Sequence, residues 1–358
     1  MIVGISLGKN QEIGVETSYS QSCNYPAVSF ILSAVRTFQI VKFVSERKPK
    51  LLITGGLGFV GSRLIKQLVT QNEYEVNIVE RYVTGRYANL GRTVETHFVD
   101  LRDSSLVKTV LKHVQPEVII HLAAISPVTY SYDHPQEVLE NNLMGTVNLA
   151  EACRETIPAF KHFIYAGTTE EYGVTQERPA NENSVCIPNS PYAISKYAGT
   201  KYLQYMNLAY DFPMTVMRCT NTYGRTNDTH FFIEKIISQM ILNPKGEVLL
   251  GEDQAVREFM YVDDHVNAYL SVLHQRVKSV GEIFNFSTGK PLQLNEVLKL
   301  IAKLTGFEGE FVRHSLPKRP LDILDHRLNS EKARTHLGWS ATVSLDEGLK
   351  RTMAFWKR

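Results

Sequence analysis

The sequence predicts an α/β protein: a doubly wound parallel sheet with a smaller C-terminal lobe interleaved with it. Three observations predict this class. Short β-rich runs alternate with helical segments from residue 51 to residue 166, an order typical of a parallel sheet covered by helices on both faces. The first run ends in a glycine-rich turn at 55–61. The chain has 358 residues, of which 43% are hydrophobic, enough to bury a sizeable core.

The first half of the chain supplies most of the predicted sheet. The strand 51–54 leads into the glycine turn, and apolar residues then recur at helical spacing from Val60 to Val69. Further strands are expected at 76–79, 97–100, 117–122 and 163–166, with helices over 103–113 and 138–150.

The second half is less regular and predicts a lobe that shares its last strands with the main sheet. Strands are expected at 213–218, 248–250 and 283–286, and helices over 231–242, 293–304 and 345–356. Ser344 and Glu347 have the spacing of a capping box before the final helix.

Composition excludes several classes of protein. With 39 Lys and Arg against 37 Asp and Glu, the net charge is +2, which argues against binding nucleic acid through bulk positive potential. The cysteines lie far apart without metal-ligand spacing, which excludes a disulfide scaffold and a zinc module and fits a reducing compartment such as the cytoplasm. No metal site is expected. The four cysteines are Cys23, Cys153, Cys186 and Cys219.

Residues 1–49 are expected to be an N-terminal extension. Its most apolar stretch, 27–35, is too short to cross a membrane, which takes roughly 20 residues. The order of charges does not match a secretory signal. A short helix over 27–44 is one interpretation, but the sequence favours a disordered leader or a start codon assigned too early.

The glycine turn predicts a dinucleotide site. Gly55 and Gly58 let the backbone turn tightly beside a pyrophosphate, and Gly61 lets the helix approach the sheet. Glu80, at the end of the second strand, is placed to accept hydrogen bonds from the adenosine ribose and therefore favours NAD. Arg81 could instead pair with a 2′-phosphate, which keeps NADP as the alternative.

Other residues are assigned to the same cofactor site. Asp100 follows the third strand and is a candidate for the adenine edge or, equally, a cap of the next helix. The remaining cofactor-binding candidates are Phe59, Val60, Leu101, Leu122, Ala123 and Ala124.

Tyr192 and Lys196 are four residues apart on a predicted helix and therefore share one face. A lysine ammonium beside a phenol favours the phenolate and lowers the tyrosine pKa toward neutrality. Tyr192 is thus a candidate to accept the proton of a sugar hydroxyl during hydride transfer.

Four motifs occur in order: TGGLGFVG at 54–61, HLAA at 121–124, NLMGT at 142–146 and YAISK at 192–196. Together they resemble the extended short-chain dehydrogenase/reductase superfamily over about 51–356. The resemblance implies a Rossmann fold with NAD(P), at 50–224 and part of 257–288, and a nucleotide-sugar lobe at 225–358. It also implies a homodimer, a catalytic pair of Tyr192 and Lys196, and a hydroxyl of Thr168 that steers the sugar O4.

Residues 166–173, AGTTEEYG, resemble the strand-end motif of nucleotide-sugar 4,6-dehydratases. In that reaction, oxidation at C4 makes the C5 proton acidic, and a carboxylate removes it as the C6 hydroxyl leaves. The resemblance makes Glu170 this base. Thr169 stands where dTDP-glucose enzymes carry Asp, as in the Thr-Ser-Glu version of GDP-mannose 4,6-dehydratases and UDP-glucuronate decarboxylases. Glu170 is then expected to act as both base and acid.

Arginines and one asparagine are the substrate-binding candidates. Asn221 lies in NTYG and Arg257 in REFMYVDD, which resemble the family segments that meet the sugar diphosphate. An arginine fork suits paired phosphates. Arg319 and Arg327, around RPLDILDHR, are further candidates, with surface ion pairing as the equal alternative.

The sequence therefore predicts an NAD-dependent nucleotide-sugar 4,6-dehydratase. The alternatives are a UDP-sugar 4-epimerase or a UDP-glucuronate decarboxylase of the same superfamily. A non-catalytic dinucleotide-sensing protein is a more remote alternative, since a sensor has no need of the Tyr192 and Lys196 pair.

Overall fold

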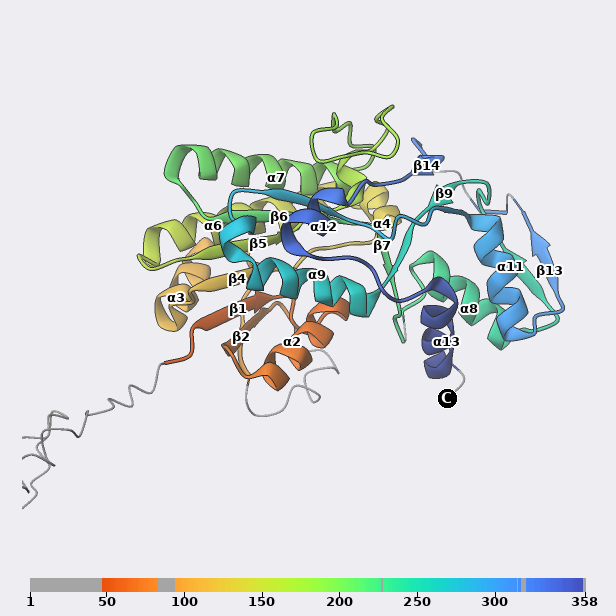
Figure 1. Ribbon diagram of the computed structural model, residues 1–358, viewed down its shortest axis with the longest axis horizontal. Helices are drawn as coiled ribbons and strands as arrows, with labels where there is room; N and C mark the ends of the chain where they lie inside the picture. Colours follow the sequence, from red (N-terminus) through yellow and green to blue (C-terminus); the bar gives the residue numbers. More distant parts are fainter. Residues whose placement is uncertain (1–46, 83–93, 227, 314, 317–319, 357–358) are drawn as a thin grey trace, which may run out of the picture. The chain divides into compact units, whose positions relative to one another are not determined.

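Seven parallel strands form the main sheet in the described part of the chain, in the order β11-β6-β5-β4-β1-β2-β3 (Figure 1). The computed structural model describes residues 47–82, 94–226, 228–313, 315–316 and 320–356; the expected helix over 27–44 lies outside them. The strands are β1 (Lys50–Thr54), β2 (Glu75–Glu80), β3 (Glu95–Phe98), β4 (Val118–His121), β5 (His162–Ala166), β6 (Met214–Cys219) and β11 (Ile283–Phe286). The strand order reverses between β1 and β4, and ligands bind at such switch points in open α/β sheets.

Alternate residues of β1 face opposite layers, as a central parallel strand requires. Leu52 packs in a core with residues of α3 (Ser104–Val114), α6 (Gly145–Thr156) and α7 (Pro191–Tyr210). Leu51 and Ile53 pack on the other side with residues of α2 (Phe59–Gln71) and α9 (Val262–His274). All three side chains are fully buried. Helices therefore cover both faces of the sheet, as Figure 1 shows, and the predicted fold class is confirmed.

The helical path between β4 and β5 contains an irregular turn. It runs through α4 (Val128–Asp133), α5 (Pro135–Leu139), the π-helical turn η2 (Glu140–Met144) and α6. π-turns inside α-helices are rare and frequently occur at functional sites. This one carries the asparagine of the NLMGT motif.

The C-terminal lobe interleaves with the sheet. It contains α8 (Phe232–Leu242), β8 (Glu247–Leu249), α11 (Leu294–Thr305), β13 (Glu310–Val312) and α13 (Leu345–Trp356). A three-stranded sheet joins β12 (Leu292–Gln293), β9 (Val256–Arg257) and β14 (Asp325–His326), and β7 (Asn221–Tyr223) pairs with β10 (Phe259–Tyr261). Between these elements the chain returns through α9 and α10 (Arg276–Ser279) to place β11 beside β6; α12 (Glu331–Leu337) contacts β11.

The structure shifts one predicted strand and adds elements. β3 ends at Phe98 rather than residue 100, because Asp100 belongs to a turn in which its carbonyl accepts the Asp103 N–H (2.9 Å). α9, α12 and β14 were not predicted. The predicted cap of α13 is present in part, since the Ser344 hydroxyl accepts the Glu347 N–H (3.2 Å).

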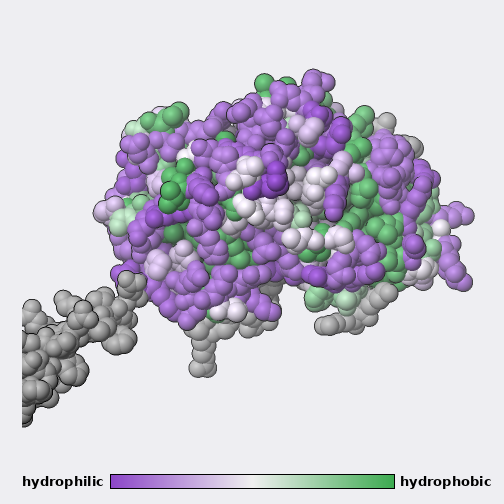
Figure 2. All heavy atoms as spheres, in the orientation of Figure 1, coloured by the Kyte–Doolittle hydropathy of each residue, from purple (hydrophilic) through white to green (hydrophobic). Residues whose placement is uncertain are grey.

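Hydrophilic side chains predominate on the face shown in Figure 2, with smaller hydrophobic areas between them. In the described ranges, no helix combines the length and the apolar character that crossing a membrane requires.

Candidate active site

The glycine turn between β1 and α2 has the predicted geometry for close backbone approach. Gly55 has φ +72°, a left-handed conformation that glycine adopts without strain. Gly58 occupies the N-cap of α2, and no side chain of the described ranges is seen to cap this end of the helix. The backbone N–H groups at the start of α2 are therefore available to an anion, aided by the helix dipole.

Gly61 is required by the packing of α2 against the turn. A Cβ there would collide with the Gly55 carbonyl oxygen and lie 2.8 Å from Gly56 Cα. We expect Gly61→Ala to lower the free energy of unfolding by about 1–3 kcal/mol and to weaken NAD binding, measured by urea unfolding and by calorimetry. Gly251→Ala is the control, because among the described residues its Cβ would meet only Leu316 Cβ, at 3.7 Å. Equal behaviour of the two variants would contradict the prediction.

Glu80 faces the glycine turn from the end of β2. Its Oε1 accepts the Leu57 N–H at 2.6 Å. Burial raises the pKa of Glu80 to about 7, and hydrogen bonds from the backbone of Leu57 and Gly56 act in the opposite direction. The structure thus places this carboxyl group beside the turn, where the sequence expects the adenosine ribose.

Arg81 is engaged by a carboxylate. Its Nε lies 3.1 Å from Asp100 Oδ2, and Arg102 binds the same carboxylate at 2.7 Å. The cap of α3 is Asp103, whose side chain accepts the N–H groups of Ser105 and Leu106. The helix-cap interpretation of Asp100 is therefore wrong, because Asp100 is used in this ion-pair group.

The segment after β4 lies against the glycine turn. Leu122 N donates to the Thr54 carbonyl (3.0 Å) and Ala123 N to the Thr54 hydroxyl (3.2 Å). A Cβ on Gly55 would lie 2.8 Å from Ala123 N. Leu101 is farther along the sheet, where its carbonyl accepts from the Asn148 side chain (3.0 Å). The predicted residues at 122–124 and the glycine turn thus meet at the switch point of the sheet.

Thr168 and Tyr192 come together at the end of β5. Thr168 caps the 3₁₀ turn η3 (Thr169–Glu171), and Tyr192 is in the first turn of α7. Burial raises the pKa of Tyr192, a hydrogen bond with Thr168 lowers it, and the charges of Glu170 and Glu171 raise it. The expected lowering of this pKa is therefore wrong for the structure, because burial disfavours the phenolate.

Lys196 lies one helical turn from Tyr192 and is 2% exposed. Its Nζ lies 4.2 Å from the centroid of the Tyr165 ring. Burial lowers the pKa of Lys196 to about 8, and the charge of Glu171 opposes this effect. The helix thus carries a buried ammonium whose charge is costly to maintain.

We expect Lys196→Met to stabilise the fold at pH 7 by about 1–3 kcal/mol, because a buried ammonium with a depressed pKa opposes folding. The pKa is about 8 in the folded state, against 10.5 for an ordinary lysine. Wild-type stability should therefore rise as pH increases from 8 to 10.5, so the advantage of the variant should shrink. Urea unfolding at pH 7 and pH 9.5 tests this, and a variant less stable at pH 7 would refute it.

Thr169 and Glu170 meet a histidine from the C-terminal lobe. His326 Nε2 lies 2.9 Å from the Thr169 carbonyl oxygen and 3.1 Å from its hydroxyl. His326 Nδ1 lies 3.9 Å from Glu170 Oε1. Sequence reasoning missed His326, which lies 157 residues beyond Thr169. The available signal was its place inside the RPLDILDHR segment.

Glu171 was also missed, and it is part of a buried network. Its Oε2 accepts from Arg218 Nε (2.9 Å) and its Oε1 from the Thr168 N–H (3.0 Å). Arg218 also donates to the Tyr172 hydroxyl (2.9 Å), which donates to Asn285 Oδ1 (2.7 Å). This network connects the turn after β5 to β6 and β11.

Asn142, in the π-turn, connects two parts of the site. Its side chain accepts the Ile125 N–H (2.8 Å), donates to the Ile125 carbonyl (3.1 Å) and donates to the Ser195 hydroxyl (3.1 Å). It therefore ties the segment after β4 to the helix that carries Tyr192. Its position in the NLMGT motif was the signal for it.

The predicted substrate-binding residues differ in their positions and in the side chains that they contact. Arg257 lies on β9, directly opposite His326 in the register with β14, and forms an ion pair with Asp322 (3.5 Å). Asn221 is half-buried on β7. Arg327 forms a bidentate ion pair with Asp325 (2.8 and 2.5 Å), the alternative that the sequence left open. Arg319 lies outside the described residues.

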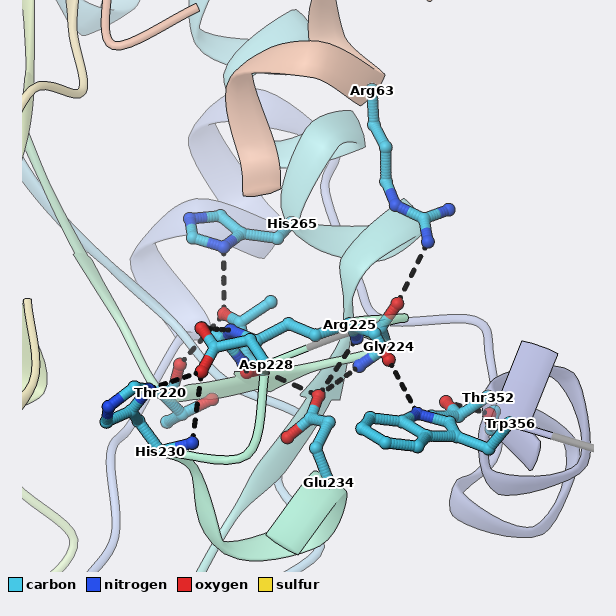
Figure 3. Close-up of polar contacts among 12 residues, drawn as sticks. Arg63, Thr220, Gly224, Arg225, Asp228, His230, Glu234, His265, Thr352 and Trp356 are labelled. Carbon is cyan, nitrogen blue, oxygen red and sulfur yellow. Dashed lines mark hydrogen bonds and ion pairs between the residues drawn. The ribbon is translucent and has the colours of Figure 1, made fainter. Parts of the chain in front are cut away.

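The turn after β7 is held by three separate helices (Figure 3). Glu234 of α8 accepts the N–H groups of Gly224 (2.8 Å) and Arg225 (2.9 Å). Arg63 of α2 donates to the Gly224 carbonyl (2.9 Å), and Trp356 of α13 donates to the Arg225 carbonyl (3.0 Å). These contacts fasten the lobe to the helix that begins at the glycine turn. Within the described ranges, no three His, Cys, Asp or Glu side chains form a group suited to a metal ion.

Comparisons with known proteins identify the family of the chain. The family model for GDP-mannose 4,6 dehydratase matches residues 52–352. A putative UDP-glucose 4-epimerase of Methanocaldococcus jannaschii is 32% identical over 311 residues, which cover 86% of this chain and 98% of that relative.

Solved structures of related enzymes have the same fold. The UDP-glucose 4-epimerase of Thermotoga maritima, solved with UDP-glucose, has a TM-score of 0.79 and 31% identity, covering 86% of this chain and 98% of the other. The dTDP-glucose 4,6-dehydratase of Streptomyces venezuelae, solved with NAD, has a TM-score of 0.77 and 27% identity, covering 86% and 97% of the two chains. Both epimerases and dehydratases are thus similar to this chain.

Proposed function

Because the chain belongs to the GDP-mannose 4,6-dehydratase family, we propose that it is an NAD-dependent nucleotide-sugar 4,6-dehydratase. One observation favours this reaction over that of an epimerase. A carboxylate, Glu170, stands at the end of β5 close enough to Tyr192 to influence its pKa, with His326 3.9 Å away. An epimerase that only oxidises and reduces C4 has no use for a base at C5.

Each of the proposed site residues has its own role in this reaction. Thr168 orients the sugar and forms a hydrogen bond with Tyr192, which accepts the O4 proton, and Lys196 lies one helical turn from Tyr192 on α7. Glu170 removes the C5 proton once C4 is a ketone, and Thr169 lies beside it. Arg257, Asn221 and Arg319 are proposed to hold the diphosphate, whereas Arg327 is paired with Asp325. The list of proposed catalytic residues is Thr168, Thr169, Glu170, Tyr192 and Lys196.

NAD fits the cofactor residues. The uncapped start of α2, the close approach at Gly55 and the carboxyl of Glu80 suit a pyrophosphate and an adenosine ribose. Arg81 is engaged by Asp100, which favours NAD over NADP. Held by these residues, NAD would supply the hydride transfer of the reaction, between C4 and C6 of the sugar. The related enzymes solved with NAD support this assignment.

A UDP-glucose 4-epimerase is the second candidate, because the relative at 32% identity carries that name. It would use Tyr192 and Lys196 in the same way, without Glu170. A UDP-glucuronate decarboxylase remains the third member of this group.

Incubation with UDP-, GDP-, dTDP- and CDP-sugars, followed by mass spectrometry, tests the proposal. Loss of one water from a substrate is the expected result. No change in mass with a changed sugar configuration would instead identify an epimerase, and loss of carbon dioxide a decarboxylase. Tyr192→Phe is the control, because it should lower the rate of all three reactions by about 10²–10⁴.

We also propose a homodimer in the cytoplasm. Apolar side chains of α7 are exposed, including Leu208 at 85%. Ile194 and Tyr205, eleven residues apart, share a face of that helix, and a second copy would cover it. The described thiols Cys153, Cys186 and Cys219 are free, which suits a reducing compartment. Light scattering of the purified protein tests the dimer.

A further inference from the structure

His326 reaches the turn after β5 from the short strand β14. Its side chain is 1% exposed. Nε2 lies 2.9 Å from the Thr169 carbonyl oxygen. Nδ1 is buried without a hydrogen-bond partner in the described part of the chain, and it faces Glu170 Oε1 at 3.9 Å. A buried polar atom with no partner is uncommon and calls for an explanation.

The contact with Thr169 determines where the ring carries its proton. A carbonyl oxygen only accepts hydrogen bonds, so Nε2 must carry the hydrogen. In the neutral ring, Nδ1 is then an acceptor, and it faces a carboxylate that also only accepts. One proton, on Nδ1 of His326 or on Glu170, converts this contact into a donor facing an acceptor.

We propose that His326 and Glu170 share a proton across this contact, so that the pair supplies both the base and the acid of water elimination. The inference rests on the proposed dehydratase function. It also gives Thr169 a role: a threonine cannot act as an acid here, but its carbonyl and hydroxyl hold His326 in place. His326 acts through Glu170 and is a positioning residue.

The protons balance with this pair. At the start, Nδ1 carries the shared proton and Glu170 is a carboxylate. Glu170 takes the C5 proton, and the electrons of the C5–H bond move into the C4 ketone to give an enolate. The enolate forms the C5–C6 double bond as the C6–O bond breaks, and the leaving oxygen departs as water with the proton from Glu170.

The proton on Nδ1 of His326 is used in the last step of the reaction. Nδ1 passes its proton to Glu170, which delivers it to C5 when C6 receives the hydride that had left C4. Solvent then returns one proton to Nδ1, and Tyr192 releases to solvent the proton that it took from O4. The net change is the loss of one water.

The charged groups around the His326 ring link its pKa to the charge of Glu170. The pKa of His326 is lowered overall by burial and by the charges of Arg257 and Arg178, whereas the charge of Glu170 and the Thr169 carbonyl oppose this effect. A second proton on the ring therefore requires a charged Glu170 beside it. Arg257 is the residue opposite His326 on β9. The proton affinity of the ring therefore depends on whether Glu170 is charged.

Two variants remove the proton that Nδ1 would share with Glu170, and each keeps a different polar contact of the ring. His326→Gln keeps an N–H able to reach the Thr169 carbonyl but has no atom in place of Nδ1. His326→Asn keeps a polar atom near the Nδ1 position and gives up the Thr169 contact. We expect His326→Gln to slow water loss by about 100-fold, to leave C4 oxidation in a single turnover within about threefold, and to remove one limb of the pH–rate profile. His326→Asn should slow water loss at least as much, because its amide near the Nδ1 position can donate a hydrogen bond but cannot release a proton.

Equal loss of oxidation and elimination in His326→Gln would show a merely structural role and overturn the proposal, as would an unchanged pH profile. A second readout needs no turnover. In ¹⁵N-histidine NMR, Nε2 of His326 should be protonated, and Glu170→Gln should lower the pKa of His326. Unchanged titration in Glu170→Gln would overturn the pair. If the wild type converts no nucleotide sugar, the proposed function fails, whereas the NMR result still decides whether the proton is shared.

Discussion

Replacing Glu171 with glutamine is expected to lower the free energy of unfolding by about 3–5 kcal/mol, because it leaves the Arg218 guanidinium buried without its counter-charge. The two side chains are 0% and 3% exposed and meet at 2.9 Å. A loss of this size is a large part of the 5–15 kcal/mol that typically stabilises a domain. Thermal and urea unfolding measure it directly.

The matched control is Glu331→Gln, which breaks an ion pair with Arg334 whose side chains are 54% and 64% exposed. Its melting temperature should equal that of the wild type, because exposed pairs contribute little. The double variant Glu171→Leu with Arg218→Met should recover part of the stability, because neither charge is then left unpaired. Similar melting temperatures for Glu171→Gln and Glu331→Gln would show that the buried pair does not hold the turn after β5.

Local patterns were sufficient to predict the main sheet. β1, the glycine turn and α2 are consecutive in the chain, so the apolar run, the glycine spacing and the helical period all describe one unit. Tyr192 and Lys196 are likewise related by a single helical turn. Each of these predictions depends only on residues that are close in sequence.

The rest of the site depends on contacts between distant segments. His326 reaches Thr169 only because the two-residue strand β14 pairs with β9, and so short a strand has no readable periodicity. The pKa of Tyr192 depends on burial, which no motif encodes. Glu170 and Glu171 are neighbours of the same type, and the sequence alone does not show that one is a candidate base and the other half of a buried ion pair.

Glu170→Gln is therefore the complementary experiment to Glu171→Gln. Glu170 is half-buried, and its partner in the described structure is His326 at 3.9 Å. We expect the variant to fold with a stability within about 0.5 kcal/mol of the wild type, and to lose about 10²–10⁴ in the rate of water elimination. Urea unfolding and mass analysis of the products measure the two effects.

In Glu170→Gln, the C4 oxidation that is retained is as informative as the water elimination that is lost. Glu170→Gln keeps Tyr192 and Thr168 and removes a charge that raises the pKa of Tyr192. Oxidation at C4 should therefore still occur and the 4-keto sugar should accumulate, detected by the absorbance of the reduced nicotinamide in a single turnover. An epimerase would respond differently, because it removes no proton from C5. Its turnover should stay within about threefold of the wild type, far from the loss expected when a general base is removed. A Glu170→Gln variant that retains full turnover would thus contradict the dehydratase assignment, and with it the role of Glu170 as the base.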